Sequence, residues 1–251
     1  MNQIRRETIR NFILQKQVVT IKEISELVPD VSSMTIHRDL EKLEQDGEII
    51  RIRGGAMAAA QHPNTESKFE TRMQSHIREK RIMAQKALSL IEPESYVLLD
   101  AGTSNLVLAQ MLPDIEMHIF TTAPNIALEL TKLVNPTIHV CGGTLNRSNQ
   151  AVSGPSTLDM LREINIATAF IGVSGFTIES GFCCGKEEER QVKRLLLEKA
   201  KRRIILMDTS KVGAIFPYKI ADFDKVDYLV SDGGLPEDVV ALAKKNGTVV
   251  L

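Results

Sequence analysis

The sequence predicts two domains of different class: an N-terminal winged helix-turn-helix over residues 1–56 and an α/β domain over residues 76–251. Two observations carry this prediction. A capped amphipathic helix near residue 32 is followed by a short basic hairpin, which is the reading half of a winged helix. Beyond residue 96, short apolar runs alternate with helices, the pattern of crossover units around a mainly parallel sheet. A polar stretch over residues 57–75 is expected to link the two domains.

The reading helix is predicted to begin after Ser32, whose hydroxyl suits an N-cap. Ile36, Leu40 and Leu43 recur at helical spacing and form one apolar face. Gly47 is expected to end the helix. The residues near its opposite face are Met34, His37, Arg38, Glu41 and Gln45.

The segments around this helix complete a small domain. An earlier helix is expected over residues 4–15, and Thr20 with Glu23 has the spacing of a capping box for a second. After the reading helix, residues 49–53 alternate apolar and basic side chains, and the next two residues are glycines that allow a tight turn. The alternative is a small helical domain that binds protein rather than DNA.

The net charge of residues 1–56 does not by itself indicate DNA binding, because this segment holds nine basic and nine acidic side chains. The distribution carries the prediction. Side chains on the reading helix are expected to read bases, hydroxyls to contact the backbone or cap the helix, and arginines to converge on phosphates. A weakly basic surface implies salt-sensitive binding that gains affinity from dimerisation. The predicted DNA-binding residues are Arg5, Ser32, Ser33, Met34, Thr35, His37, Arg38, Arg51 and Arg53.

These residues carry a family resemblance. The run from Val31 to Leu40, the spacing to Leu43 and the closing Arg-Gly-Gly-Ala at 53–56 resemble the DeoR family of sugar-operon repressors. The turn over residues 28–31 is one residue longer than in that family, and His37 stands where the family often has arginine. The resemblance implies double-stranded operator DNA as a partner.

Composition argues against several other classes of protein. The chain has 251 residues, of which 43% are hydrophobic, a formal net charge of −1, and no apolar run of membrane-spanning length. Few aromatic side chains and no tryptophan argue against a stacking platform for single strands. Three cysteines favour a reducing cytoplasm over a disulfide framework. Adjacent Cys183 and Cys184 lack metal-ligand spacing, so we expect small half-buried residues, no metal site and no cofactor.

The C-terminal domain follows a helix expected over residues 77–91 and ended by Pro93. Its strands are expected at residues 96–99, 119–120, 137–140, 167–171, 203–207, 228–230 and 248–250. Helices between them are expected at residues 105–111, 125–134, 156–162, 187–201 and 236–244.

Polar and glycine residues follow five of these strands, where ligands bind in open parallel sheets. Glycine lets a ligand approach the backbone, while hydroxyls and helix-start amides hold phosphate. Each cluster alone is a weak signal, since strand ends often carry turn residues, but five at corresponding ends indicate a binding edge. The clusters are Asp100–Ser104, Thr121–Thr122, Cys141–Thr144, Gly172–Phe176 and Asp208–Lys211.

The same clusters resemble the effector domain of the DeoR family, so the resemblance spans nearly the whole chain. It implies a fold related to ribose-5-phosphate isomerase that binds a phosphorylated sugar or related metabolite. Under that resemblance Thr103, Ser104 and Asn105 hold phosphate, Lys211 adds positive charge, and Asp100 and Thr121 contact sugar hydroxyls or fix the loops. The further residues that match are Gly102, Gly142, Gly143, Gly172, Glu188 and Lys193.

An enzyme is the competing class: a sugar-phosphate isomerase fused to a DNA-binding domain. Such chemistry needs a general base near the reacting carbon, and the loop at 172–175 carries no carboxylate. The acidic run at 187–189 is instead typical of a helix N-terminus. A constitutive architectural protein would leave the strand-end glycines and hydroxyls unexplained. We therefore expect a homodimeric or homotetrameric regulator whose DNA affinity an effector changes.

Overall fold

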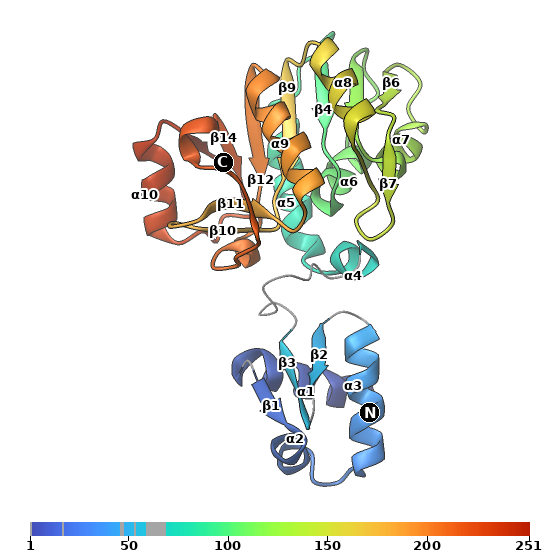
Figure 1. The fold of residues 1–251 in the computed structure, drawn as a ribbon, viewed down its shortest axis with the longest axis vertical. Helices are drawn as coiled ribbons and strands as arrows, with labels where there is room; N and C mark the ends of the chain where they lie inside the picture. The colour runs from blue at the N-terminus through green and yellow to red at the C-terminus, as the bar shows by residue number, and fades with distance from the viewer. Residues whose placement is uncertain (1, 17, 46–47, 53, 59–68) are drawn as a thin grey trace. The chain divides into compact units, whose positions relative to one another are not determined.

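The computed structural model describes residues 2–16, 18–45, 48–52, 54–58 and 69–251. The chain divides into two compact units, Met1–Thr71 and Arg72–Leu251 (Figure 1). The predicted helix end at Gly47 and most of the predicted linker fall outside the described residues. Within that linker, β3 continues to Ala58 and α4 covers Phe69–Gln74.

The N-terminal unit combines three helices with a three-stranded antiparallel sheet in the order β1-β3-β2. The sequence predicts all three helices and the hairpin but not β1. Ten buried apolar side chains from the helices and strands make its core. Its elements are α1 (Asn2–Lys16), β1 (Val18–Thr20), α2 (Ile21–Leu27), α3 (Ser33–Gln45), β2 (Ile49–Ile52) and β3 (Gly55–Ala58).

Local chemistry fixes where these elements begin. Thr20 and Glu23 form the predicted capping box at the start of α2, each side chain accepting the other residue's backbone N–H. At the hairpin, Gly54 has a φ of +82°, and a Cβ on Gly55 would lie 2.0 Å from the Val19 carbonyl oxygen. The Gly-Gly pair is therefore required for β3 to pass so close to β1.

The C-terminal unit is built on a seven-stranded sheet in the order β15-β14-β12-β9-β4-β5-β6, with every neighbouring pair parallel. All seven strands match strands expected from the sequence to within two residues. Their bounds are β4 (Tyr96–Leu99), β5 (His118–Thr121), β6 (Thr137–Val140), β9 (Thr168–Gly172), β12 (Arg202–Leu206), β14 (Tyr228–Val230) and β15 (Val249–Val250).

Helices cover both faces of this sheet (Figure 1). Alternate strand residues divide between two buried clusters, one packed with α5, α6 and α7 and the other with α8, α9 and α10. This arrangement explains why the strands read as continuous apolar runs. The helices are α5 (Ile77–Leu88), α6 (Thr103–Gln110), α7 (Pro124–Leu130), α8 (Pro155–Glu163), α9 (Glu187–Lys199) and α10 (Glu237–Lys245).

Two small antiparallel sheets, which the sequence did not predict, flank the main one. Strands β10 (Gly175–Thr177), β11 (Gly181–Cys184) and β13 (Tyr218–Ala221) form one, and β7 (Thr144–Asn146) with β8 (Ala151–Ser153) forms the other. Cys183 and Cys184 lie on β11 and are fully buried, not half-buried as expected. Short 3-10 turns η2 (Thr209–Lys211) and η3 (Phe223–Lys225) follow β12 and β13.

Candidate functional site

The outer face of α3 is the candidate DNA interface. Ile36 and Leu40 are fully buried on its inner face, whereas His37 and Arg38 are exposed and Met34 is 73% exposed. No hydrogen bond or ion pair with another described residue engages His37 or Arg38, so both side chains are available to a partner. The predicted apolar packing face of the helix is confirmed by this burial, and the DNA-reading role of the exposed side chains stays a prediction.

The start of α3 is fixed by Ser32, the predicted N-cap, and Thr35, a predicted contact to the DNA backbone or the helix cap. The Ser32 hydroxyl accepts the backbone N–H of Thr35 at 3.3 Å and lies 3.0 Å from the Thr35 hydroxyl. Ser32 thus acts as the predicted N-cap. Ser33 is exposed on the first turn, whereas the predicted phosphate contact Arg53 lies outside the described residues.

Arg5 differs from His37 and Arg38, because it is engaged inside the unit. Its Nε lies 2.6 Å from Oδ2 of Asp39, and Arg6 Nε lies 3.8 Å from the other carboxylate oxygen. Asp39 is buried within α3, and only 17% of the Arg5 side chain is exposed. The side-chain hydrogen bond to Asp39 raises the pKa of Arg5. Arg5 therefore joins α1 to the reading helix.

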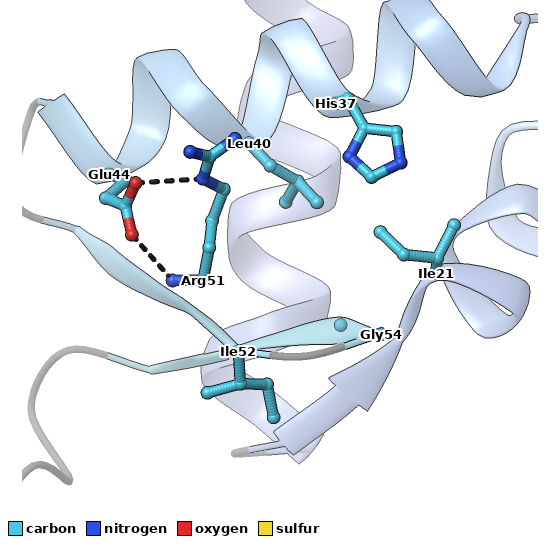
Figure 2. A pocket seen from close by; sticks show the side chains of 8 residues that line it. Ile21, His37, Leu40, Glu44, Arg51, Ile52 and Gly54 are labelled. Carbon is cyan, nitrogen blue, oxygen red and sulfur yellow. Dashed lines mark hydrogen bonds and ion pairs between the residues drawn. The ribbon is translucent and has the colours of Figure 1, made fainter.

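Arg51 is likewise engaged, with Glu44 at the far end of α3 (Figure 2). One Glu44 carboxylate oxygen accepts the Arg51 backbone N–H at 2.9 Å, and the other accepts its Nε at 2.8 Å. These bonds, the backbone one first, lower the pKa of Glu44. Glu44 therefore faces the wing and pairs with a predicted phosphate contact.

A pocket of about 320 Å³ lies between α3 and the wing, as Figure 2 shows. His37 and the Arg51–Glu44 pair lie on its rim, and Ile52 is 40% exposed beside it. The pair spans from helix to strand and so fixes how far the wing stands from the reading helix. The full lining is Ile21, His37, Leu40, Glu44, Arg51, Ile52, Gly54 and Gly55.

In the C-terminal unit, the candidate ligand site lies at the carboxyl edge of the parallel sheet. Its centre is Lys193, which projects from α9 and is buried. Its Nζ pairs with Oδ2 of Asp100 after β4 and donates to the Gly172 carbonyl after β9 at 2.9 Å. Burial disfavours the ammonium, but the Asp100 and Glu189 carboxylates outweigh it and raise the pKa of Lys193.

Asp100 also accepts the Thr122 hydroxyl at 3.3 Å, and Thr122 in turn accepts the Ala101 N–H at 3.2 Å. Thr121 is fully buried: its hydroxyl donates to the Leu99 carbonyl at 2.8 Å and accepts the Ala123 N–H. These bonds tie the ends of β4 and β5 together. Of the two roles predicted for Asp100 and Thr121, the structure shows the fixing of loops.

The turn into α6 has the features of an anion cradle. Gly102 adopts a φ of +141°, and an added Cβ would meet nothing within 4 Å, so the space beside it is open. Thr103, Ser104 and Asn105 form the first turn of α6, where backbone N–H groups point out of the helix. Asn105 is fully buried and donates to the Phe170 carbonyl, but its Oδ1 has no hydrogen-bond partner among the described residues.

On the neighbouring side, Asp208 and Lys211 follow β12. Asp208 caps η2 by accepting the Ser210 N–H at 3.1 Å, and Lys211 is half-buried within η2. Only β9 separates β12 from β4 in the sheet. At the usual strand spacing, the ends of β12 and β4 therefore lie about 10 Å apart, at the same edge of the sheet.

Lys80 of α5 belongs to this cluster, although no motif in the sequence marks it. It is buried, donates to the Ser75 carbonyl, and interacts electrostatically with Asp208 and Lys211. Desolvation lowers the pKa of Lys80 to about 8, against an opposing effect of Asp208. Only the three-dimensional fold brings α5 to the end of β12.

Glu188 lies apart from the cluster, because it is exposed on α9. Its neighbour Glu189 is the acid that interacts with Lys193, and it also accepts the Asn149 amide. Gly142 and Gly143 follow β6; the Thr157 hydroxyl donates to the Gly142 carbonyl at 2.7 Å, and a Cβ on Gly143 would clash with Thr157. Gly143 therefore serves the close packing of this turn against α8, whereas a Cβ on Gly142 would meet nothing within 4 Å.

None of the helices in the described ranges is both long and apolar enough to cross a membrane. Comparison with known proteins agrees with the two-unit organisation. A sequence profile described as the DeoR-like helix-turn-helix domain matches residues 5–62, and one described as the DeoR C terminal sensor domain matches residues 75–233.

Full-length relatives show the same arrangement. The HTH-type transcriptional regulator YgbI of Escherichia coli K12 is 33% identical over 96% of this chain and 94% of its own. The HTH-type transcriptional repressor GlcR of Bacillus subtilis 168 is 32% identical over 97% and 93%. Among solved structures, ribose 5-phosphate isomerase A of Methanocaldococcus jannaschii covers 54% of each chain with a TM-score of 0.39 and 16% identity. The chain thus belongs to the DeoR family of helix-turn-helix transcriptional regulators.

Proposed function

We propose that this protein represses a carbohydrate-metabolism operon and that a phosphorylated sugar or related metabolite changes its affinity for operator DNA. The observation that carries the DNA half is the exposed, unengaged Arg38 on the outer face of α3. Relatives named as the HTH-type transcriptional repressor GlcR, a putative aga operon transcriptional repressor and an L-fucose operon activator support the regulation of an operon, and the last name supports a sugar operon. Two of these three names favour repression.

In this proposal, Met34, His37 and Arg38 contact base edges in the major groove. Arginine in a bidentate bond with guanine is worth about 1–3 kcal/mol of discrimination. Arg5 and Arg51 position the reading helix and the wing. Arg5 anchors α1 to α3 through Asp39, and Arg51 holds the wing to α3 through Glu44. Both guanidinium groups retain exposed surface from which to approach a phosphate.

The effector phosphate is proposed to occupy the α6 turn, between Thr103, Ser104 and Lys211. Helix-start amides and their partial positive charge favour an anion there. Lys80 adds a second cation on the same side. The unsatisfied Oδ1 of Asn105 is suited to accept a hydrogen bond from a sugar hydroxyl.

We further propose that the C-terminal unit is a binding switch and not an isomerase. Asp100, which shares Lys193 with the Gly172 carbonyl, is held by Lys193 and Thr122, so it is not a free base. Glu188, the other carboxylate in the predicted set, is exposed on α9. Turnover of pentose or hexose phosphates by the purified protein, abolished in Glu188→Gln or Asp100→Asn, would contradict this assignment.

Selection of bound duplexes from a random DNA library, followed by fluorescence-anisotropy titration, tests the DNA half. Arg38→Ala should lose about 1–3 kcal/mol per half-site on the selected duplex while its circular dichroism stays unchanged. Arg38→Lys is the matched control, since it keeps the charge and loses the bidentate geometry. It should retain binding to non-specific DNA but lose specificity. Parental affinity in Arg38→Ala would contradict the assigned reading face.

A further inference from the structure

Strand β6 ends the seven-stranded sheet with one edge unpaired. The N–H groups of Thr137 and Cys141 donate to β5 carbonyls at 2.9 Å. Because peptide groups alternate in direction along a strand, those of Ile138 and Val140 point away from β5. Across the parts of the chain that the structure describes, no other strand pairs with this edge.

The edge has few of the features that usually protect such strands. Its four residues, Thr-Ile-His-Val, carry no charge, proline or bulge, and the nearest proline, Pro136, lies just before the strand begins. Apolar side chains are exposed on the elements beside it, α7, the loop after α7 and β7, which gather at this end of the sheet in Figure 1. The exposed apolar residues are Leu128 (71%), Val134 (85%), Val140 (48%) and Leu145 (51%).

Charge at this edge does not oppose a second copy of the same surface. Glu129 and Lys132, the charged side chains on α7 and just after it, neutralise each other in an ion pair. A strand edge supplies alternating donors and acceptors, so it is complementary to itself under a two-fold rotation, which makes the pairing antiparallel. An identical chain therefore satisfies both the backbone groups and the apolar flank.

We propose that β6 pairs antiparallel with β6 of a second copy, with the two-fold axis at His139. This register places Ile138 opposite the partner's Val140, so that every outward peptide group gains a bond. If the two-fold axis passed through Ile138 or Val140 instead, that residue would face its own copy. The other outward residue would then face a residue outside β6. The result is one continuous sheet across two copies.

His139 then faces the partner's His139 in a pair without backbone bonds, where Cα atoms approach to about 4.5 Å. Its ring is held for this position on the α8 face of the sheet. It stacks on Phe120 with ring centroids 4.3 Å apart, and its Nε2 lies 3.1 Å from Nδ1 of His118. In each copy the His139 ring is thus held in place by Phe120 and His118 before the two copies meet.

Proline substitution tests the edge because it removes an N–H. Val140→Pro deletes an outward donor that β5 does not use, so the sheet within each chain is retained. Val250→Pro on β15 is the matched control, since the flanking N–H groups of Val249 and Leu251 donate inward and that of Val250 points outward at the opposite edge. Analytical ultracentrifugation of the full chain gives the readout, with circular dichroism as the check on folding.

We expect Val140→Pro to weaken the association on the order of 100-fold, as loss of two backbone hydrogen bonds per interface implies, and to halve the sedimenting mass. Val250→Pro should behave as the parent. A parent that sediments as a monomer, or a folded Val140→Pro with parental mass, would overturn the proposal.

A cross-linking variant tests the register even if the proline variant does not fold. His139→Cys should form a disulfide-linked dimer on oxidation, because paired residues without backbone bonds bring Cβ atoms within disulfide reach. The native cysteines are buried and do not compete. Val249→Cys on the exposed opposite edge is the control. Cross-linking of Val249→Cys in place of His139→Cys would show that the other edge is used.

Discussion

Replacement of Lys193 by methionine removes one partner of the buried ion pair at the carboxyl edge of the sheet. The Lys193 and Asp100 side chains are only 7% and 4% exposed. Methionine preserves the apolar stem but leaves the Asp100 carboxylate with the Thr122 hydroxyl as its remaining hydrogen-bond partner among those described. Breaking a buried pair in this way costs about 3–5 kcal/mol, and loss of the bond to the Gly172 carbonyl adds about 1 kcal/mol.

Urea denaturation followed by circular dichroism measures this cost. A double-mutant cycle with Asp100→Asn should give a coupling of at least about 2 kcal/mol, because the double variant no longer buries an isolated charge. Lys219→Met is the matched control: its pair with Asp222 is about half exposed, and such pairs contribute about 0–1 kcal/mol. If Lys193→Met and Lys219→Met were equally stable, the ion pair would not organise this site.

Three further changes probe local features of the fold. Gly55→Ala should unfold the wing and abolish DNA binding at a temperature where the C-terminal unit remains folded, because its Cβ would lie 2.0 Å from the Val19 carbonyl oxygen. A thermal denaturation curve whose first transition is the same as that of the parent would exclude this close approach. Thr20→Ala should cost the N-terminal unit about 1 kcal/mol through loss of the α2 cap, measurable by urea denaturation. Burial first, and then the neighbouring imidazole of His118, lower the pKa of His139, so the folded state favours its neutral form. Its contribution to stability is therefore full above about pH 6.5 and is lost as the pH falls. His139→Gln should flatten the dependence of melting temperature on pH between 7.5 and 5.5.

In the N-terminal unit, periodicity and caps were sufficient to predict the helices. Ile36 and Leu40 identify the packing face of α3, and Thr20 with Glu23 marks the start of α2, because these signals are local. The partners of Arg5 and Arg51 were not predictable. Their carboxylates lie 34 and 7 residues away along the chain, and a count of charges does not reveal which of them pair.

In the C-terminal unit, the parallel strands were predicted because each is an apolar run between helices. The strands β10, β11 and β13 were missed, since Gly-Phe-Thr, Gly-Phe-Cys-Cys and Tyr-Lys-Ile-Ala are not apolar runs set between helices. Glu188 and Glu189 are adjacent, yet a helix turns about 100° per residue, so only one of them can face Lys193. Lys80 joins the cluster through tertiary packing alone.

The central claim is that a phosphorylated sugar bound at the α6 turn changes DNA affinity. The most direct measurement is anisotropy titration of the selected duplex with the parent and Lys211→Ala, in the presence of a panel of pentose and hexose phosphates and of the unphosphorylated sugars. The account predicts that at least one sugar phosphate shifts DNA affinity by about 5-fold or more, that its unphosphorylated form does not, and that Lys211→Ala removes the shift while keeping ligand-free DNA affinity. A shift of equal size with the unphosphorylated sugar, or a full shift in Lys211→Ala, would contradict it.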